Sequence, residues 1–253
     1  MQNKAMFFRY KIIVEYDGTG LSGWQKQKHS SSVQECIENA INSFTRENVT
    51  VYGAGRTDAG VHALGQVAHF DLTKCLEEKA IRNAINHFLK PHKISIVDVK
   101  HVENSFHARF DAKQKVYTYK ILNREAPSPI LKNKAWHVKE YLDIDKIQSA
   151  ANLLIGKYDF SSFRGTSCQA KSPIRTIDYI SVCREQDIIS ISIAGRSFLY
   201  NQVRIITGCL RKVGSGKINN EDIKTILLSK NRSNAAETAP AYGLYLSKIF
   251  YDA

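Results

Sequence analysis

Strand and helix periodicities alternate twice along this chain, and that order favours an α+β fold more strongly than any single residue does. In the first half, alternating apolar residues predict a strand over 10–17 that stops at the glycines of DGTGLSGW. Ser32 and Glu35 form a capping-box pattern ahead of an apolar stripe from Val33 to Phe44, which predicts an amphipathic helix. The remaining segments of this half predict strands over 49–55 and 66–72 and a helix over 76–89, and the segment 94–102 closes the half.

The second half repeats the pattern loosely. A strand is predicted over 116–122, and a helix that starts at about Asp143 and ends at Gly156 buries Ile147, Ala151 and Leu154. Two paired strands over 174–183 and 188–194, helices over 197–213 and 221–228, and a last strand over 244–251 complete the pattern. Residues 1–7 are expected to be a loose leader and 123–134, with two prolines, a long loop. We therefore expect two α+β halves, 1–104 and 105–253, each with antiparallel strands and helices on one face.

The charge balance indicates a polyanionic partner. The 253 residues include 36 Lys plus Arg against 24 Asp plus Glu, a formal net charge of +12. Nucleic acid is the leading partner class, although a basic surface that only aids solubility fits the charge equally well. Five widely spaced cysteines without a CxxC pair predict reduced, structural thiols rather than a zinc site. The N-terminus has no long apolar region and no stretch reaches membrane-spanning length, so a cytoplasmic protein without membrane attachment is expected.

The run GRTDAGVHA, from Gly55 to Ala63, is the segment most suggestive of chemistry. It lies between two predicted strands, and Gly55 and Gly60 permit backbone conformations that other residues avoid. Asp58 can therefore be held on a tight loop that a substrate approaches closely. The alternative is an ordinary turn in which Asp58 bonds its own backbone, and the loop alone favours this alternative. His62 is expected to make a structural hydrogen bond rather than to act in chemistry.

Further motifs supply the missing context. GRTDAGVHA resembles the signature of the TruA-type tRNA pseudouridine synthases, whose catalytic aspartate occupies the position of Asp58. Similar stretches follow in order along nearly the whole chain: YDGTGLSGWQKQ, SFHARFDAKQKVYTY, YDFSSFR, SFLYNQVRIITG and APAYGLYL. One departure is Leu21, where family members often carry an aromatic residue.

The resemblance implies a reaction and a set of residues. Members of this family detach uracil from C1′ of its ribose, rotate it and reattach it through C5, without cofactor or metal. Asp58 would be the nucleophile. Tyr117 would stack on the uracil, although alternation places it on one strand face with Tyr119 and makes core packing the natural alternative.

Three other residues match the family's substrate-binding positions. Arg204 matches the active-site arginine, whose alternative role is a solvated or phosphate-binding side chain. Arg56, two residues before Asp58, matches the arginine that holds the displaced nucleotide, and its guanidinium can pair with phosphates and stack on bases. Leu244 matches an apolar residue of the pocket wall, with a plain core role nearly as well supported.

The same resemblance implies two ferredoxin-like (RRM-like) halves whose antiparallel sheets meet at a basic central cleft. It further implies a homodimer that binds tRNA across both subunits and modifies uridines 38 to 40 of the anticodon stem-loop. Two alternatives stay open at this point. The chain could be a non-catalytic RNA-binding module, which the intact GRTDAGVHA disfavours, or a synthase acting on another RNA. DGTGLSGW lacks the Lys-Ser/Thr ending of a phosphate loop, which argues against a nucleotide-triphosphate site.

Overall fold

The computed structural model describes residues 7–27 and 30–252, and the chain divides into two compact units. Unit 1 is Met1–Lys113 with Leu246–Ala253, and unit 2 is Gln114–Tyr245. These units differ from the expected halves 1–104 and 105–253, because the division follows Lys113 and most of the last strand returns to unit 1. There the backbone of Gly65 approaches the Ser247 carbonyl so closely that a Cβ on Gly65 would lie 2.9 Å from its oxygen. Of the expected leader 1–7, all but Phe7 lies outside the described residues.

Unit 1 is an antiparallel sheet with two helices. Its elements are β1 (Phe8–Tyr16), α1 (Val33–Thr45), β2 (Tyr52–Gly53), β3 (His62–Leu72), α2 (Glu78–Leu89), β4 (Ile94–Val102) and the greater part of β11 (Leu244–Phe250). The strands follow the order β4-β1-β3-β11, and β2 also pairs with β3. In the register of this sheet, Tyr10 lies opposite Phe70 on one side and His101 on the other.

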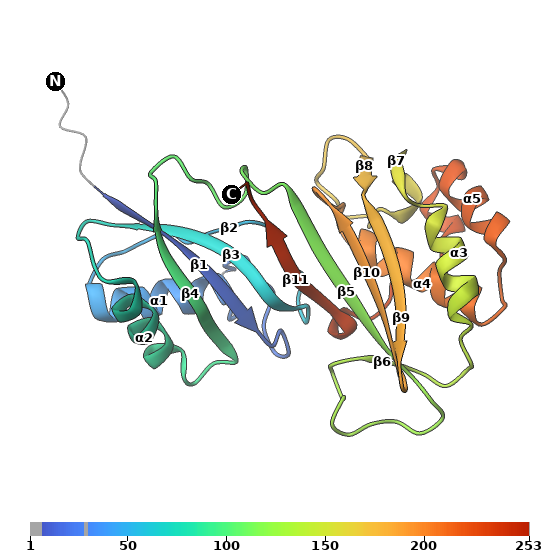
Figure 1. Ribbon diagram of the computed structural model, residues 1–253, viewed down its shortest axis with the longest axis horizontal. Helices are drawn as coiled ribbons and strands as arrows, with labels where there is room; N and C mark the ends of the chain where they lie inside the picture. The colour runs from blue at the N-terminus through green and yellow to red at the C-terminus, as the bar shows by residue number, and fades with distance from the viewer. Residues whose placement is uncertain (1–6, 28–29, 253) are drawn as a thin grey trace. The chain divides into compact units, whose positions relative to one another are not determined.

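The two helices of unit 1 cover one face of its sheet (Figure 1). Alternate residues of β1 point to that face, and Tyr10, Ile12 and Val14 are fully buried there. The helix α1 begins as predicted, because the Ser32 hydroxyl accepts a hydrogen bond from the Glu35 N–H. It ends at Thr45, and the C-cap residue Arg46 has a left-handed φ of 63°. Sequence patterning was therefore enough to locate this helix.

Unit 2 combines sheet strands with three α-helices within its described residues. Its elements are β5 (Gln114–Asn123), β6 (Trp136–Val138), α3 (Ile144–Asn152), β7 (Gly156–Asp159), β8 (Ile174–Ile177), β9 (Tyr179–Glu185), β10 (Ile188–Gly195), α4 (Gln202–Gly214) and α5 (Asn220–Ser229), with short 3₁₀ turns at Ser161–Phe163, Arg232–Asn234 and Ala241–Gly243. The order β5-β10-β9 is antiparallel, β6 runs parallel to β5, and β7 and β8 form a separate ladder.

The core of unit 2 lies between this sheet and its helices (Figure 1). The strand β10 turns Ile189, Ile191 and Ile193 to one face, and all three are fully buried. They lie opposite Ile121, Tyr119 and Tyr117 of β5, in that order. The predicted face of alternating isoleucines is thereby confirmed.

Several predicted boundaries are wrong for identifiable reasons. The strand expected over 49–55 shrinks to β2, because the Val51 N–H donates to the Glu38 carboxylate instead of to a neighbouring strand. The helix expected from residue 197 begins at Gln202, since Asn201 has a left-handed φ of 61°. The helix expected to reach Gly156 stops at Asn152, and the strand expected over 174–183 is interrupted at Asp178.

The cysteines are free thiols in the structure, but not all of them have a packing role. Cys36 and Cys209 are buried, as structural thiols should be. Cys75 and Cys183 are exposed. The prediction of structural thiols therefore fails for the exposed pair.

Candidate active site

Asp58 lies on a tight turn at the start of β3. Its carbonyl accepts a hydrogen bond from the Val61 N–H at 3.1 Å, which closes a four-residue turn. Gly60 has a φ of +80°, as the sequence predicted, whereas Gly55 is not among the glycines with positive φ. Gln66 is fully buried and donates from Nε2 to the Gly55 carbonyl at 2.8 Å. The half-buried Asp58 side chain is thus carried by a backbone fixed on both sides.

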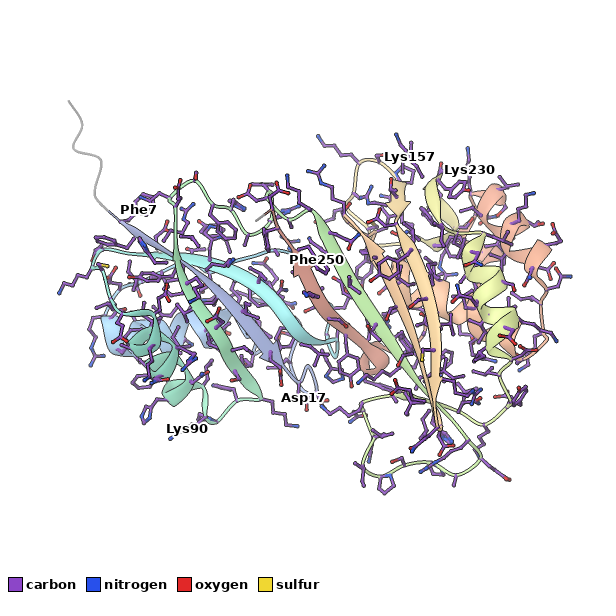
Figure 2. All side chains as sticks on the ribbon, viewed as in Figure 1. Phe7, Asp17, Lys90, Lys157, Lys230 and Phe250 are labelled. Atoms are coloured by element: carbon purple, nitrogen blue, oxygen red, sulfur yellow. The ribbon has the colours of Figure 1, made fainter. Side chains whose placement is uncertain are left out.

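The loop after β1 packs against this turn. Asp17 is the first residue of that loop and lies at the opposite end of β1 from Phe7 (Figure 2). The Trp24 N–H donates to the Thr57 carbonyl at 3.1 Å. The Thr57 hydroxyl lies 2.7 Å from that of Tyr16, and both residues are buried. The residue before Asp58 is therefore held by its backbone and by its side chain.

Glycines make this close approach possible. A Cβ on Gly18 would overlap the Val61 carbonyl oxygen, and one on Gly23 would overlap the Thr57 carbonyl oxygen. Gly23 also has a φ of +95°, which disfavours other residues. The DGTGLSGW segment therefore lies directly against the turn that carries Asp58.

His62 connects the two loops. It is 1% exposed, and its Nδ1 accepts a hydrogen bond from the Gly18 N–H at 3.0 Å. The same Nδ1 lies 3.1 Å from Asp17 Oδ1, a contact that becomes an ion pair on protonation. The Gly18 bond agrees with the structural role expected for His62.

Arg56, two residues before Asp58, is exposed. Its Nε donates to Gln25 Oε1 at 3.2 Å. Sequence reasoning missed Gln25, although it belongs to the GWQKQ run that carried part of the resemblance. The side chain of Arg56 is therefore anchored at one nitrogen.

In unit 2, the two candidate tyrosines of β5 have different environments. Tyr119 is fully buried, its hydroxyl donates to the Pro240 carbonyl at 2.8 Å, and burial raises its pKa. Tyr117 lies on the same face but is half-buried, with its ring at 90° to Phe198 and 5.3 Å between centroids. Core packing therefore describes Tyr119, while Tyr117 keeps part of its ring accessible.

Arg204 lies in the first turn of α4 and is half-buried. Its Nε donates to the Ala239 carbonyl at 2.7 Å, and Nη1 donates to Asn201 Oδ1 at 2.8 Å. Asn201 sits at the N-cap position but does not cap the helix, and its side-chain oxygen binds Arg204 instead. These bonds orient the guanidinium, which excludes a freely solvated side chain.

Leu244, the first residue of β11, is 6% exposed and belongs to unit 2. Its burial agrees with a core role and does not distinguish that role from a pocket wall. Of the site residues expected from sequence, unit 1 holds Asp58 and Arg56, and unit 2 holds Tyr117, Arg204 and Leu244.

The described residues hold neither a metal-binding cluster nor a membrane-spanning helix. Across 7–27 and 30–252, no group of three or more His, Cys, Asp or Glu side chains is arranged to hold a metal ion. In the same residues, no helix combines the length and apolar character needed to cross a bilayer.

Comparison with known proteins places these features in a family. Residues 12–111 and 150–252 match the family model described as tRNA pseudouridine synthase. A relative from Ehrlichia ruminantium (strain Gardel), named tRNA pseudouridine synthase A, is 52% identical over 244 residues, covering 96% of this chain and 99% of its own. Relatives of the same name from Wolbachia pipientis wMel and Anaplasma phagocytophilum (strain HZ) are 52% and 48% identical, each covering 96% of this chain and 100% of its own. The first matched range contains Arg56 and Asp58, and the second contains Arg204 and Leu244.

Proposed function

This chain belongs to the tRNA pseudouridine synthase family, and we propose that Asp58 is the nucleophile with which it converts uridine to pseudouridine in tRNA. The observation that carries the proposal is the Asp58 turn, in which a carboxylate is held by a backbone fixed on both sides. A nucleophile contributes most when its position is set before the substrate arrives. The Thr57 contacts to Trp24 and Tyr16 provide that preorganisation.

The chemistry requires few groups from the protein. Uracil leaves C1′ of its ribose, rotates and returns through C5, so the base is both the leaving group and the incoming group. An ionised carboxylate can form the covalent intermediate that bridges these two steps. Because the base is moved rather than oxidised or reduced, the reaction is an isomerisation that balances without a co-reactant.

The residues of unit 2 are assigned by the same proposal. Tyr117 stacks on the target uracil, which its partly accessible ring supports and which the buried Tyr119 could not do. Arg204 is assigned as the active-site arginine that supplies positive charge to the reaction, and its bonds to Ala239 and Asn201 support a fixed orientation. Leu244 forms part of the apolar wall. Arg56 holds the nucleotide after it has flipped out of its stack.

The architecture proposed from the family is consistent with each unit taken separately. A ferredoxin-like half has two βαβ stretches and an antiparallel order in which the first strand lies between the fourth and the third. In unit 1, β1 lies between β4 and β3, and β2 pairs with β3, which supports this assignment. In unit 2, β5, β9 and β10 correspond to the first three strands of such a half, with α3 between β5 and β9 in the chain. The third of them, β10, lies between the first and the second, as this order requires. A basic central cleft, a homodimer, a cytoplasmic location and modification at uridines 38 to 40 of the anticodon stem-loop complete the proposal.

The test compares Asp58→Asn with the wild type. Asparagine keeps the size of aspartate and removes the negative charge that a nucleophile needs. Tritium release from tRNA carrying C5-tritiated uridine measures the reaction, because forming the bond at C5 must expel that hydrogen. Filter binding of the same variant measures affinity for tRNA. We expect release to vanish while binding stays nearly unchanged, since many phosphate contacts provide the affinity.

Two results would contradict parts of this proposal. Substantial tritium release by a folded Asp58→Asn variant would exclude Asp58 as the nucleophile. The modified positions can be located by sequencing of pseudouridine-specific adducts. If the wild type modifies only uridines outside the anticodon stem-loop, the target assignment is wrong and the proposed chemistry still holds.

A further inference from the structure

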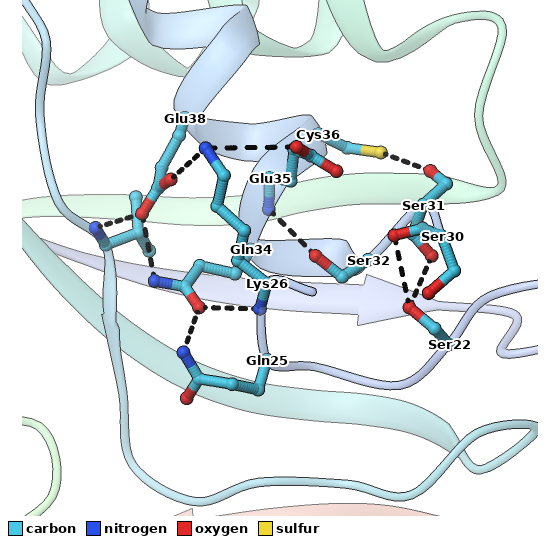
Figure 3. A network of polar contacts seen from close by, with 11 residues as sticks. Ser22, Gln25, Lys26, Ser30, Ser31, Ser32, Gln34, Glu35, Cys36 and Glu38 are labelled. Atoms are coloured by element: carbon cyan, nitrogen blue, oxygen red, sulfur yellow. Dashed lines mark hydrogen bonds and ion pairs between the residues drawn. The ribbon is translucent and has the colours of Figure 1, made fainter. Parts of the chain in front are cut away.

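A chain of side-chain hydrogen bonds leads from α1 to Arg56, and most of it is drawn in Figure 3. Glu38 Oε1 accepts from the Val51 N–H at 3.0 Å and from Gln34 Nε2 at 2.9 Å. Gln34 Oε1 accepts from the Lys26 N–H at 3.0 Å and from Gln25 Nε2 at 2.9 Å. At its end, Gln25 Oε1 accepts from Arg56 Nε at 3.2 Å.

The direction of every bond in this chain is fixed by its chemistry. A backbone N–H can only donate, and an ionised carboxylate can only accept. Because the Lys26 N–H donates to one end of the Gln34 amide and Glu38 accepts from the other, Gln34 cannot be rotated end for end. Gln34 therefore presents an oxygen to Gln25, and the Gln25 NH₂ group must donate the hydrogen bond between them. That leaves the Gln25 carbonyl oxygen, and not an N–H, facing Arg56.

Burial makes this orientation costly to change. Gln34 is 7% exposed, so reversing its amide would leave a buried donor facing a donor and an acceptor facing an acceptor, without water to compensate. Reversing the half-buried Gln25 amide would set two oxygens against each other at Gln34 and two N–H groups against each other at Arg56. The exposed Arg56 therefore meets a fixed acceptor at its Nε. Within the described part of the chain, this is the one hydrogen bond of its guanidinium. Both terminal nitrogens, the pair that binds a phosphate or a base edge in bidentate fashion, remain available.

We propose that Gln25 is a positioning residue for Arg56: it holds the guanidinium by Nε so that the two terminal nitrogens face the RNA. This inference rests on the proposed role of Arg56 in holding the flipped nucleotide. Gln34 and Glu38 act one step further back, by fixing the direction of the Gln25 amide. The result is a pre-set arginine on a surface loop, where an unanchored arginine would sample many rotamers.

The experiment is a double-mutant cycle on kcat/KM for tritium release from tRNA. Methionine replaces Gln25 and Arg56, singly and together, because it keeps an unbranched side chain and removes the hydrogen bond. Gln27→Met is the matched control, since Gln27 lies two residues away in the same loop and, among described residues, its side chain donates to the Ser22 carbonyl. Thermal unfolding of each variant checks that it is folded.

We expect Gln25→Met to lower kcat/KM by about tenfold, the effect of losing one hydrogen bond to a charged group. The Gln27→Met control should stay near the wild type. If Gln25 acts through Arg56, then Gln25→Met should have no further effect in the Arg56→Met background. A merely structural role would instead lower activity by the same factor in both backgrounds.

The possible failures point to different errors. If Arg56→Met retains wild-type activity, the proposed role of Arg56 is wrong, and the positioning role falls with it. If Arg56→Met is impaired but Gln25→Met is silent, or if the two effects multiply, Arg56 keeps its role and the positioning role alone is overturned.

Discussion

Gly23 offers a way to move the Asp58 turn without touching Asp58. A methyl group on Gly23 would lie inside van der Waals contact of the Thr57 carbonyl oxygen and 3.0 Å from the Asp58 carbonyl carbon. Ordinary contacts at such atoms are about 3.5 Å or longer, so the Thr57–Asp58 peptide must shift by roughly 0.5 to 1 Å. A misplacement of about 1 Å can cost roughly 100-fold in rate. Gly23→Ala should therefore lower kcat/KM by about 10- to 100-fold.

The same loop contains a control that separates displacement from backbone strain. Gly20 has a φ of +83°, close to the +95° of Gly23, but no atom lies within 4 Å of the place where its Cβ would be. Both alanine variants incur a backbone penalty of roughly 1 kcal/mol or more. For a chain of this size, that lowers Tm by about 2 to 4 °C per kcal/mol. Only Gly23→Ala should add the displacement of the catalytic turn.

The assay is tritium release from tRNA, measured on variants whose far-ultraviolet circular dichroism matches the wild type. We expect Gly20→Ala to stay within about twofold of wild-type kcat/KM, because it adds backbone strain but its methyl group would not contact the Asp58 turn. A folded Gly23→Ala enzyme with wild-type activity would refute the reasoning, because it would mean that the Asp58 turn needs no fixed position. Equal losses in the two variants would attribute the effect to strain alone.

Three further outcomes are expected. Tyr117→Phe should keep tRNA binding and part of the activity, and Tyr117→Leu should lose both, because only phenylalanine preserves the stacking face. Wild-type tritium release by Tyr117→Leu would show that Tyr117 does not contact the uracil. If Arg204 is the counter-charge of the reacting carboxylate, as proposed, Arg204→Met should lower kcat and move the acidic limb of the pH–rate profile to higher pH. An unchanged profile would indicate a phosphate contact instead. Burial lowers the pKa of His69 from 6.5 to about 4. As the pH falls from 6.5, His69 is therefore protonated in the unfolded state before it is protonated in the folded state. The free energy of unfolding should then decrease between pH 6.5 and about 4, by up to roughly 1.4 kcal/mol per pH unit. His69→Asn, whose oxygen can still accept from the Ala108 N–H, should flatten that dependence in urea unfolding, and an unaltered slope would exclude His69 as its source.

Elements whose stability is local could be predicted from the sequence. The strand predicted over 188–194 differs from β10 by one residue at its end, and α1 was predicted with its Ser32 cap, because alternation and capping act over a few residues. The errors arose where distant groups decide. The strand expected over 49–55 is shortened to β2 because the Val51 N–H binds Glu38. No pattern of neighbouring residues signals that bond.

The candidate site divides along the same line. The position of Asp58 on a tight turn could be inferred from its motif, because a turn is a local structure. The difference between Tyr117 and Tyr119 could not, since alternation puts both on one face and burial alone separates them. Gln25 was overlooked because its partner Arg56 is 31 residues away in the chain.

The DGTGLSGW segment shows why a motif can be informative before its purpose is known. Its glycines suit a phosphate loop in part, yet the segment lacks the residues that would bind phosphate. In the structure, Gly18 and Gly23 face the Val61 and Thr57 carbonyls, one on each side of Asp58. Because these glycines have no side chain, the two backbones can lie in close contact. The DGTGLSGW segment therefore fixes the position of the Asp58 turn, and Gly60 within the turn fixes its conformation. The two motifs are therefore one structural unit, and a substitution that fills either contact should act on the reaction even though it lies outside GRTDAGVHA.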